Sequence, residues 1–208
     1  TWSSTVVMKI DLAGEKDRGL AMGLNEFAGY SAVGVIAFLS GYVANKYGIT
    51  PYPFYIGIFI SIVGFVLSLF WVKDTRAFVH KESTTDTSEK LDNVFIHTTF
   101  KNKTLSSVTQ AGLVNNLNDG MIWGLLPIFL LSLNFNTENI GIIAAIYPAV
   151  WGIGQLFTGK MSDVYSKESM LFWGMLIQGI TILLIPLAES FYPLAMLSAL
   201  LGLGTALV

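Results

Sequence analysis

Long apolar runs separated by short polar segments form the main pattern of this chain. A bilayer core about 30 Å thick is crossed by roughly 20 mostly apolar residues in a helix. Several runs are near or above that length, so we expect helices that cross a membrane, with water-facing connections between them. The runs cover residues 19–44, 54–72, 107–133, 140–157 and 170–187, and a sixth begins near Tyr192.

A soluble helical bundle is the alternative interpretation of these runs. Its helices would each carry a polar face, whereas residues 56–72 have none. The composition agrees with a membrane protein, because 53% of the residues are hydrophobic and 12% are charged, against about 25% charged in a soluble domain. The expected fold class is therefore all-α, a polytopic transmembrane helical bundle.

The basic residues are distributed unequally between the connections. If the predicted spans alternate in direction, eleven of the 12 lysines and arginines fall on one side and Lys46 alone on the other. Cytoplasmic connections carry the excess of basic residues, so the first side is predicted to be cytoplasmic. The eleven residues are Lys9, Lys16, Arg18, Lys73, Arg76, Lys81, Lys90, Lys101, Lys103, Lys160 and Lys167.

Composition argues against several classes of site. The net charge of -2 and the lack of a basic stripe with interleaved aromatic residues argue against nucleic-acid binding. The chain has no cysteine, and its two histidines, His80 and His97, have no second ligand pattern around them, so we expect no metal site. The sequence also lacks a phosphate-binding glycine-rich loop, so nothing predicts nucleotide hydrolysis or a cofactor.

Residues 73–106 form the longest connection and are rich in serine, threonine and charge, which is typical of a solvated linker. Residues at helical spacing within it suit a short helix, either on the inner membrane surface or packed against a neighbouring loop. These residues are Leu91, Val94, Phe95 and Thr98.

The connection after residues 140–157 contains a loop motif, in which an aspartate follows a glycine by four residues and a basic residue precedes the next helix. It resembles the cytoplasmic loop motif of the major facilitator superfamily. Residues 164, 166 and 168 depart from the family pattern, as in the degenerate copy of the second half. The residues that fit are Gly159, Asp163, Lys167 and Leu171, and those that depart are Val164, Ser166 and Glu168.

The run that precedes this loop, residues 147–155, is similar to the eighth helix of prokaryotic members of that family. The resemblance implies that the chain covers the end of helix four through most of helix ten, with helices one to four and eleven to twelve wholly or largely outside it. Residues 1–72 would then belong to the N-terminal half, 73–106 would be the cytoplasmic linker, and 107–208 would belong to the C-terminal half.

A second segment, residues 41–48, also resembles the loop motif. It has Asn45 in place of the aspartate and lies on the side with a single basic residue. If residues 41–48 were the family loop, no long linker would be expected one helix later, whereas residues 73–106 form one. We therefore prefer the first register.

The resemblance implies that the loop aspartate of one half meets a helix of the other half. Asp163 would then hold the N-terminal end of helix five, which is the run at residues 19–44. A carboxylate is stabilised there by the positive end of the helix. Such a contact would close the cytoplasmic side. In the alternative interpretation Asp163 caps its own turn and faces water. The residues expected at this gate are Arg18, Gly19, Gly159, Asp163 and Lys167.

Asp119 is predicted to lie near the bilayer midplane, within the run at residues 107–133. A carboxylate there costs roughly 2.5–3.5 kcal/mol, so it should face a cavity or a partner. The resemblance implies that this helix lines the central cavity, which makes its polar residues the first candidates for substrate contact, and proton exchange at Asp119 is a hypothesis. Alternatively, Asp119 bonds to the asparagines and fixes helix packing. The candidates are Asn115, Asn116, Asp119 and Trp123, with Asn118 beside them.

Helix five carries a second intramembrane acid, Glu26, next to Asn25. Helix eight runs in the opposite direction and places Tyr147, Trp151 and Gln155 on one face at spacings of four. The resemblance implies that helices five and eight meet between the two halves. We therefore expect Glu26 to face the stripe from Trp151 to Gln155, although the two aromatic residues are also ordinary packing residues.

These features predict a secondary transporter, not an enzyme, that moves a small solute by alternating access about a midplane site. Two alternatives stay open: a transport-dead sensor or scaffold of the same fold, and an integral membrane enzyme. We expect a monomer in the inner or plasma membrane, in contact with lipid and a small-molecule substrate.

Overall fold

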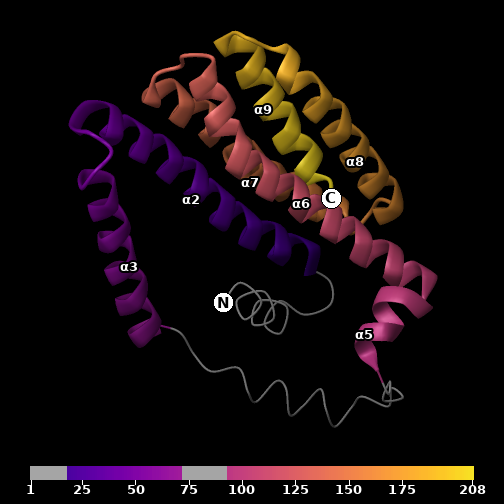
Figure 1. Cartoon of the computed structure of the whole chain (residues 1–208). Coiled ribbons are helices and arrows are strands. Elements are labelled where there is room, and N and C mark those ends of the chain that lie inside the picture. Colours follow the sequence, from indigo (N-terminus) through magenta and orange to yellow (C-terminus); the bar gives the residue numbers. More distant parts are fainter. Residues whose placement is uncertain (1–17, 72–92) are drawn as a thin grey trace. The chain divides into compact units, whose positions relative to one another are not determined.

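The computed structural model describes residues 18–71 and 93–208, and every regular element within these ranges is a helix (Figure 1). The predicted all-α class is confirmed for this part of the chain. The end of helix four and most of the linker lie outside the described residues. The elements are α2 (Arg18–Tyr47), α3 (Tyr52–Trp71), α5 (Val94–Ile96), the π-helix η1 (His97–Lys101), α6 (Lys103–Ser132), α7 (Thr137–Met161), α8 (Lys167–Leu184), the 3-10 helix η2 (Ile185–Leu187) and α9 (Phe191–Ala206).

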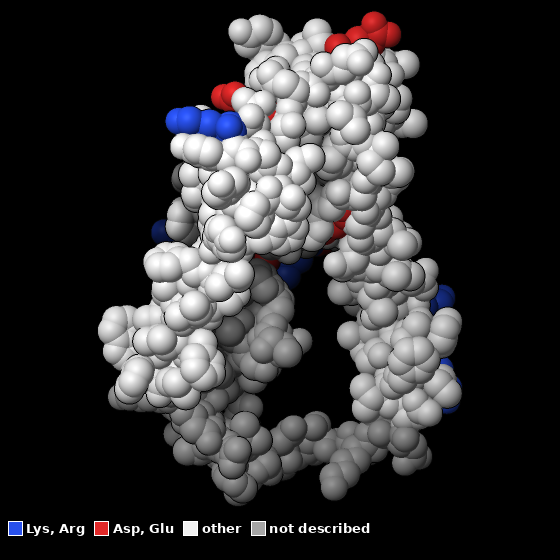
Figure 2. Space-filling model, turned by 60° about the vertical axis from the view of Figure 1, so that its left-hand side comes forward, with Lys and Arg blue, Asp and Glu red and all other residues white. Residues whose placement is uncertain are grey.

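Four helical segments of the described ranges are long and apolar enough to cross a membrane: Gly19–Tyr47, Tyr52–Trp71, Thr137–Met161 and Lys167–Leu187. Helix α6 has 30 residues but is not among them. The polar residues at 115, 116, 118 and 119 lower its hydropathy. Most of the surface in Figure 2 is uncharged, as expected for helices surrounded by lipid.

Helix α6 begins at Lys103, so the last residues of the predicted linker are already helical. The helical spacing found in the linker corresponds to α5 and η1. Asn93 is the N-cap of α5, and its side chain accepts a hydrogen bond from Ile96 N at 3.1 Å. Residues 93–124 belong to a compact unit of their own, in which Phe95 and Phe100 pack edge to face.

The second compact unit comprises residues 1–73 and 125–208. Within its described part, α2 packs on α7, α7 packs on α9, and α9 packs on α8 (Figure 1). Helix α3 contacts α2 and buries none of its residues. The core therefore lies along α7, whose buried positions recur at helical spacing.

Small residues bring α2 and α7 together in antiparallel directions along their length. At one end, a methyl group added to Gly41 would lie 2.8 Å from Gly141 Cα, closer than real Cβ atoms approach another heavy atom. Towards the other end, Gly23 lies directly against the backbone carbonyl of Gln155. Glycine is needed at such positions because the two backbones touch. We call this contact surface the α2–α7 interface.

Glycines on α7 and α9 also allow close approach. An added methyl group at Gly152 would lie 2.8 Å from Ser31 N, and one at Gly202 would lie 2.6 Å from Tyr147 O. One at Gly154 would lie 2.7 Å from Ala206 Cβ. Helix α7 therefore contacts α2 and α9 through different glycines.

Candidate functional site

The middle of the α2–α7 interface is aromatic. Tyr30 of α2 stacks on Trp151 of α7, with ring centroids 3.3 Å apart and an interplanar angle of 22°. Tyr147 lies one turn from Trp151, at a centroid distance of 5.8 Å. Trp151 is 5% exposed, and its buried Nε1 has no hydrogen-bond partner among the described residues. These three rings form the aromatic cluster of the interface.

Tyr30 is a residue that sequence reasoning missed. It follows Glu26 by four residues and so shares its face of α2, which is the signal that could have identified it. Gly23 lies at the level of Gln155 and Tyr30 at the level of Trp151. Along the helix axis, Glu26 therefore lies between the levels of Trp151 and Gln155, which are the two ends of the predicted stripe.

Glu26 is half-buried, and its Oε1 accepts a hydrogen bond from Asn25 Nδ2 at 3.5 Å. Asn25 itself is 7% exposed. On α7, Thr158 Oγ1 donates to Gln155 Oε1 at 3.5 Å. Each of these two bonds joins neighbours on one helix.

Tyr147 connects α7 to α9. Its hydroxyl lies 3.3 Å from Thr205 Oγ1, and Thr205 Oγ1 donates to Leu201 O at 2.9 Å. The tyrosine is therefore the donor of the first bond, because the threonine proton is used in the second. Both side chains are buried. Thr205 gave no signal in the sequence, since its partner lies 58 positions away.

The predicted gate residues gather where α2 begins and α7 ends. The carboxyl group of Asp163 lies directly against Gly19, in the first turn of α2, and an added methyl group at Gly19 would lie 2.8 Å from Asp163 Cγ. Gly159 also belongs to this contact, since a methyl group there would lie 2.7 Å from Gly19 O. Arg18 begins α2, and its side chain lies outside the described residues.

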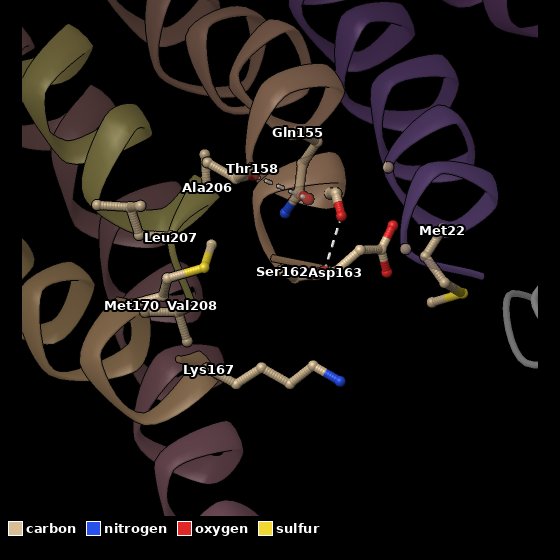
Figure 3. Close-up of a pocket in the computed structure, with 13 residues that line it drawn as sticks. Met22, Gln155, Thr158, Ser162, Asp163, Lys167, Met170, Ala206, Leu207 and Val208 are labelled. Carbon is tan, nitrogen blue, oxygen red and sulfur yellow. Dashed lines mark hydrogen bonds between the residues drawn. The ribbon is translucent and has the colours of Figure 1, made fainter. Parts of the chain in front are cut away.

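The loop that carries Asp163 is held by local hydrogen bonds. Ser162 Oγ donates to Gly159 O at 2.7 Å, and Asp163 N donates to Lys160 O at 3.2 Å. The N-cap of α8 is Ser166, which accepts from Ser169 N at 3.5 Å. Asp163 therefore does not cap the helix that follows it, and its carboxyl group points toward α2 (Figure 3).

A pocket of about 320 Å³ opens beside this contact. Figure 3 shows Asp163 and Lys167 at its edge, with Gln155 and Thr158 deeper along α7. Asp163 and Lys167 are themselves exposed. The pocket is bounded by α2, α7, α8 and α9, and its lining residues are Gly19, Met22, Gly23, Gln155, Thr158, Gly159, Ser162, Asp163, Lys167, Met170, Ala206, Leu207 and Val208.

On α6, the predicted polar face divides by burial. Asp119 is 7% exposed and follows the buried stripe that continues through Ile122 and Leu126. Asn116 is exposed and donates to Gly112 O at 2.8 Å, while Trp123 is 50% exposed. The two residues thus lie outside the buried stripe. Asn115, Asn118 and Asp119 each have an interaction partner.

The described residues contain no group of three or more His, Cys, Asp or Glu side chains that could hold a metal ion. The two acids predicted to lie within the membrane, Glu26 and Asp119, lie on separate helices. The arrangement therefore offers carboxyl groups on separate helices, an aromatic cluster and a carboxylate at a helix start.

Comparison with known families gives matches over the whole chain. The sequence profile described as Major Facilitator Superfamily matches residues 1–109 and, a second time, residues 108–208.

Individual relatives are more distant. The chain is 27% identical over 191 residues to the multidrug resistance protein MdtG of Citrobacter koseri, which covers 88% of this chain and 45% of that protein. It is 26% identical to the protein of the same name from Salmonella schwarzengrund, with the same coverage. For the one from Serratia proteamaculans the identity is 25%, over 88% of this chain and 44% of that protein. The chain thus spans less than half the length of these relatives. No solved structure matches it.

Proposed function

The chain belongs to the major facilitator superfamily, and from that membership we propose that it is part of a secondary transporter that moves a small solute by alternating access. The observation that carries this proposal is the contact of Asp163 with the first turn of α2. It places an acidic loop residue against a helix that is separated from it by more than a hundred positions and by the linker.

The proposed division of the chain follows the sequence. Residues 1–72 belong to the N-terminal half, 73–106 form the linker, and 107–208 belong to the C-terminal half. The α2–α7 interface is then a contact between halves. The second profile match, which begins at residue 108, supports this division. The excess of basic residues supports a cytoplasmic location of the linker and of the Asp163 loop, and we call this end of the interface the inner end.

Closure of the inner end follows from helix electrostatics. The first N–H groups of α2 have no partner within the helix and carry partial positive charge. Because Gly19 has no side chain, the carboxyl group of Asp163 can reach the backbone there. Rocking of the halves would withdraw the carboxylate and open the pocket beside it. In this proposal Gly159 allows the close approach, while Arg18 and Lys167 supply nearby positive charge.

The solute would bind between the halves near the middle of the helices. The aromatic cluster supplies flat apolar faces for an organic molecule, and Trp151 Nε1 supplies a donor without a partner in the described structure. The relatives are named multidrug resistance proteins, so we propose small organic compounds as the first substrates to test. Proton coupling through Glu26 or Asp119 is part of the same proposal.

Transport by the full-length protein in proteoliposomes tests this function, with a panel of fluorescent organic dyes as substrates. We expect dye flux above that of empty vesicles, and a reduction of about two- to fivefold in Asp163→Asn, because a carboxylate at a helix start contributes about 0.3–1 kcal/mol. Glu168→Gln removes a charge from the first turn of α8, just after this loop, without touching Gly19, and should leave flux near that of the wild type.

Two results would contradict the proposal. Dye binding without flux would favour a sensor or scaffold of the same fold. Chemical conversion of the dye would favour a membrane enzyme, although the family and the names of the relatives point to a transporter.

A further inference from the structure

The end of the α2–α7 interface away from Asp163 contains a hydrogen bond between side chains of the two helices. Asn45 Nδ2 donates to Glu138 Oε2 at 3.2 Å. Asn45 lies in the last turn of α2 and Glu138 in the first turn of α7. The bond therefore joins residues that lie 93 positions apart, on opposite sides of the linker.

Local structure fixes both partners. Asn136 caps α7 by accepting from Asn139 N at 2.8 Å, which places Glu138 in the first turn, where the helix dipole favours a carboxylate. Lys46, the neighbour of Asn45, lies with Nζ 5.3 Å from the centre of the Tyr47 ring.

The backbone contact next to this pair is tight. Gly41 precedes Asn45 by one turn, and Gly141 follows Glu138 by about one turn. These two glycines are in backbone contact. Separation of the two helices at this end would have to break the side-chain bond together with the glycine contact.

We propose that Asn45 and Glu138, here named the outer pair, hold the α2–α7 interface closed on the side opposite the Asp163 loop. This proposal rests on the proposed function, because it assigns the pair to the closed state of the outer side in an alternating-access cycle. The pair is exposed to water, so its bond is weak enough to break in each cycle. One partner is a neutral amide, so donor and acceptor can be exchanged by substitution.

A cysteine inside the interface can report whether the outer end is open. The chain has no cysteine of its own. Ala37 is a suitable position, since its carbonyl oxygen lies 3.3 Å from the place of an added methyl group at Gly141. In the full-length protein in intact cells, a membrane-impermeant maleimide should label Ala37→Cys slowly while the outer end is closed.

The variants, all in the Ala37→Cys background, test the pair by exchanging its donor and its acceptor. Asn45→Asp places two carboxylates face to face and should speed labelling roughly two- to tenfold. Combining it with Glu138→Gln restores the bond, with the amide at position 138 donating to the carboxylate at position 45. Labelling should then return to the starting rate. Lys46→Gln makes the same charge change as Asn45→Asp beside the pair and should leave labelling unchanged.

The outcomes separate the outer pair from the proposed function. Equal labelling rates in all variants, or faster labelling that the double variant does not reverse, would overturn the outer pair even if dye flux is present. If Asn45→Asp does not fold, Asn45→Ala removes the donor without adding charge, and unchanged labelling in it would count equally against the proposal. Dye flux, measured separately, decides the transport function.

Discussion

The two ends of the α2–α7 interface are closed by different chemistry. At the inner end a carboxyl group lies directly against a glycine in the first turn of α2. At the outer end two side chains share a hydrogen bond of 3.2 Å. The inner contact uses the backbone of its partner helix, so it depends on the absence of a side chain. The outer contact depends on which two side chains are present.

This difference predicts how each end tolerates change. Substitution of an interface glycine such as Gly23 introduces atoms where the backbones already touch, and the nearest atoms are backbone atoms that cannot rotate away. Substitution of Asn45 or Glu138 alters a hydrogen bond that a bond to water can replace. The contact at Gly19 should therefore be sensitive to the size of the residue at position 19, and the outer pair to hydrogen-bonding pattern and charge.

The largest expected effect is that of added volume in the interface. Gly23→Ala brings a methyl group against the carbonyl of Gln155, and overpacking of this kind costs about 1–3 kcal/mol. We expect a lower unfolding temperature in detergent and reduced dye flux. Gly57→Ala in α3, where an added methyl group meets nothing within 4 Å, is the matched control. Equal effects of the two variants would show that the interface is not close-packed.

A smaller effect is expected from a substitution between the two ends of the interface, because it changes neither the Asp163 contact nor the outer pair. Tyr147→Phe removes the donor to Thr205, and loss of one buried hydrogen bond costs about 0.5–1.5 kcal/mol. Chemical unfolding should show this loss. Labelling of Ala37→Cys from outside should not change, because the bond joins α7 to α9 within the proposed C-terminal half. Faster labelling would mean that the two faces of α7 are coupled.

The sequence predicted the helices and the inner contact better than the outer pair. Apolar length alone locates α3, and the resemblance of the loop at Gly159 to a family motif placed Asp163 near Gly19. Tyr30 and the Asn45–Glu138 bond were missed. Such pairs depend on the antiparallel register of two helices that are distant in sequence, and the register follows from backbone contacts that composition and periodicity do not specify.

The segment around Asn45 shows this limit clearly. In the sequence, residues 41–48 were only a weaker copy of the loop motif, with an asparagine in place of the acid. In the structure, Gly41 contacts Gly141 and Asn45 bonds to Glu138. Asparagine supplies the amide donor that the carboxylate of Glu138 needs, which an aspartate would not.

The smallest expected effect concerns the charge of the inner contact. Met22 lines the pocket beside Asp163, so a maleimide added outside inverted vesicles, whose outer surface is the cytoplasmic face, should label Met22→Cys when the inner end opens. Asp163→Asn keeps the size of the side chain and removes its charge. The helix start then loses about 0.3–1 kcal/mol of attraction, and labelling should rise about two- to fivefold.

High salt should bring the wild type closer to this variant, since it screens exposed charges, whereas it should leave the variant itself unchanged. If Asp163→Asn is labelled at the wild-type rate at low salt, steric contact rather than charge closes the inner end, and the contrast between the two ends would be one of geometry alone.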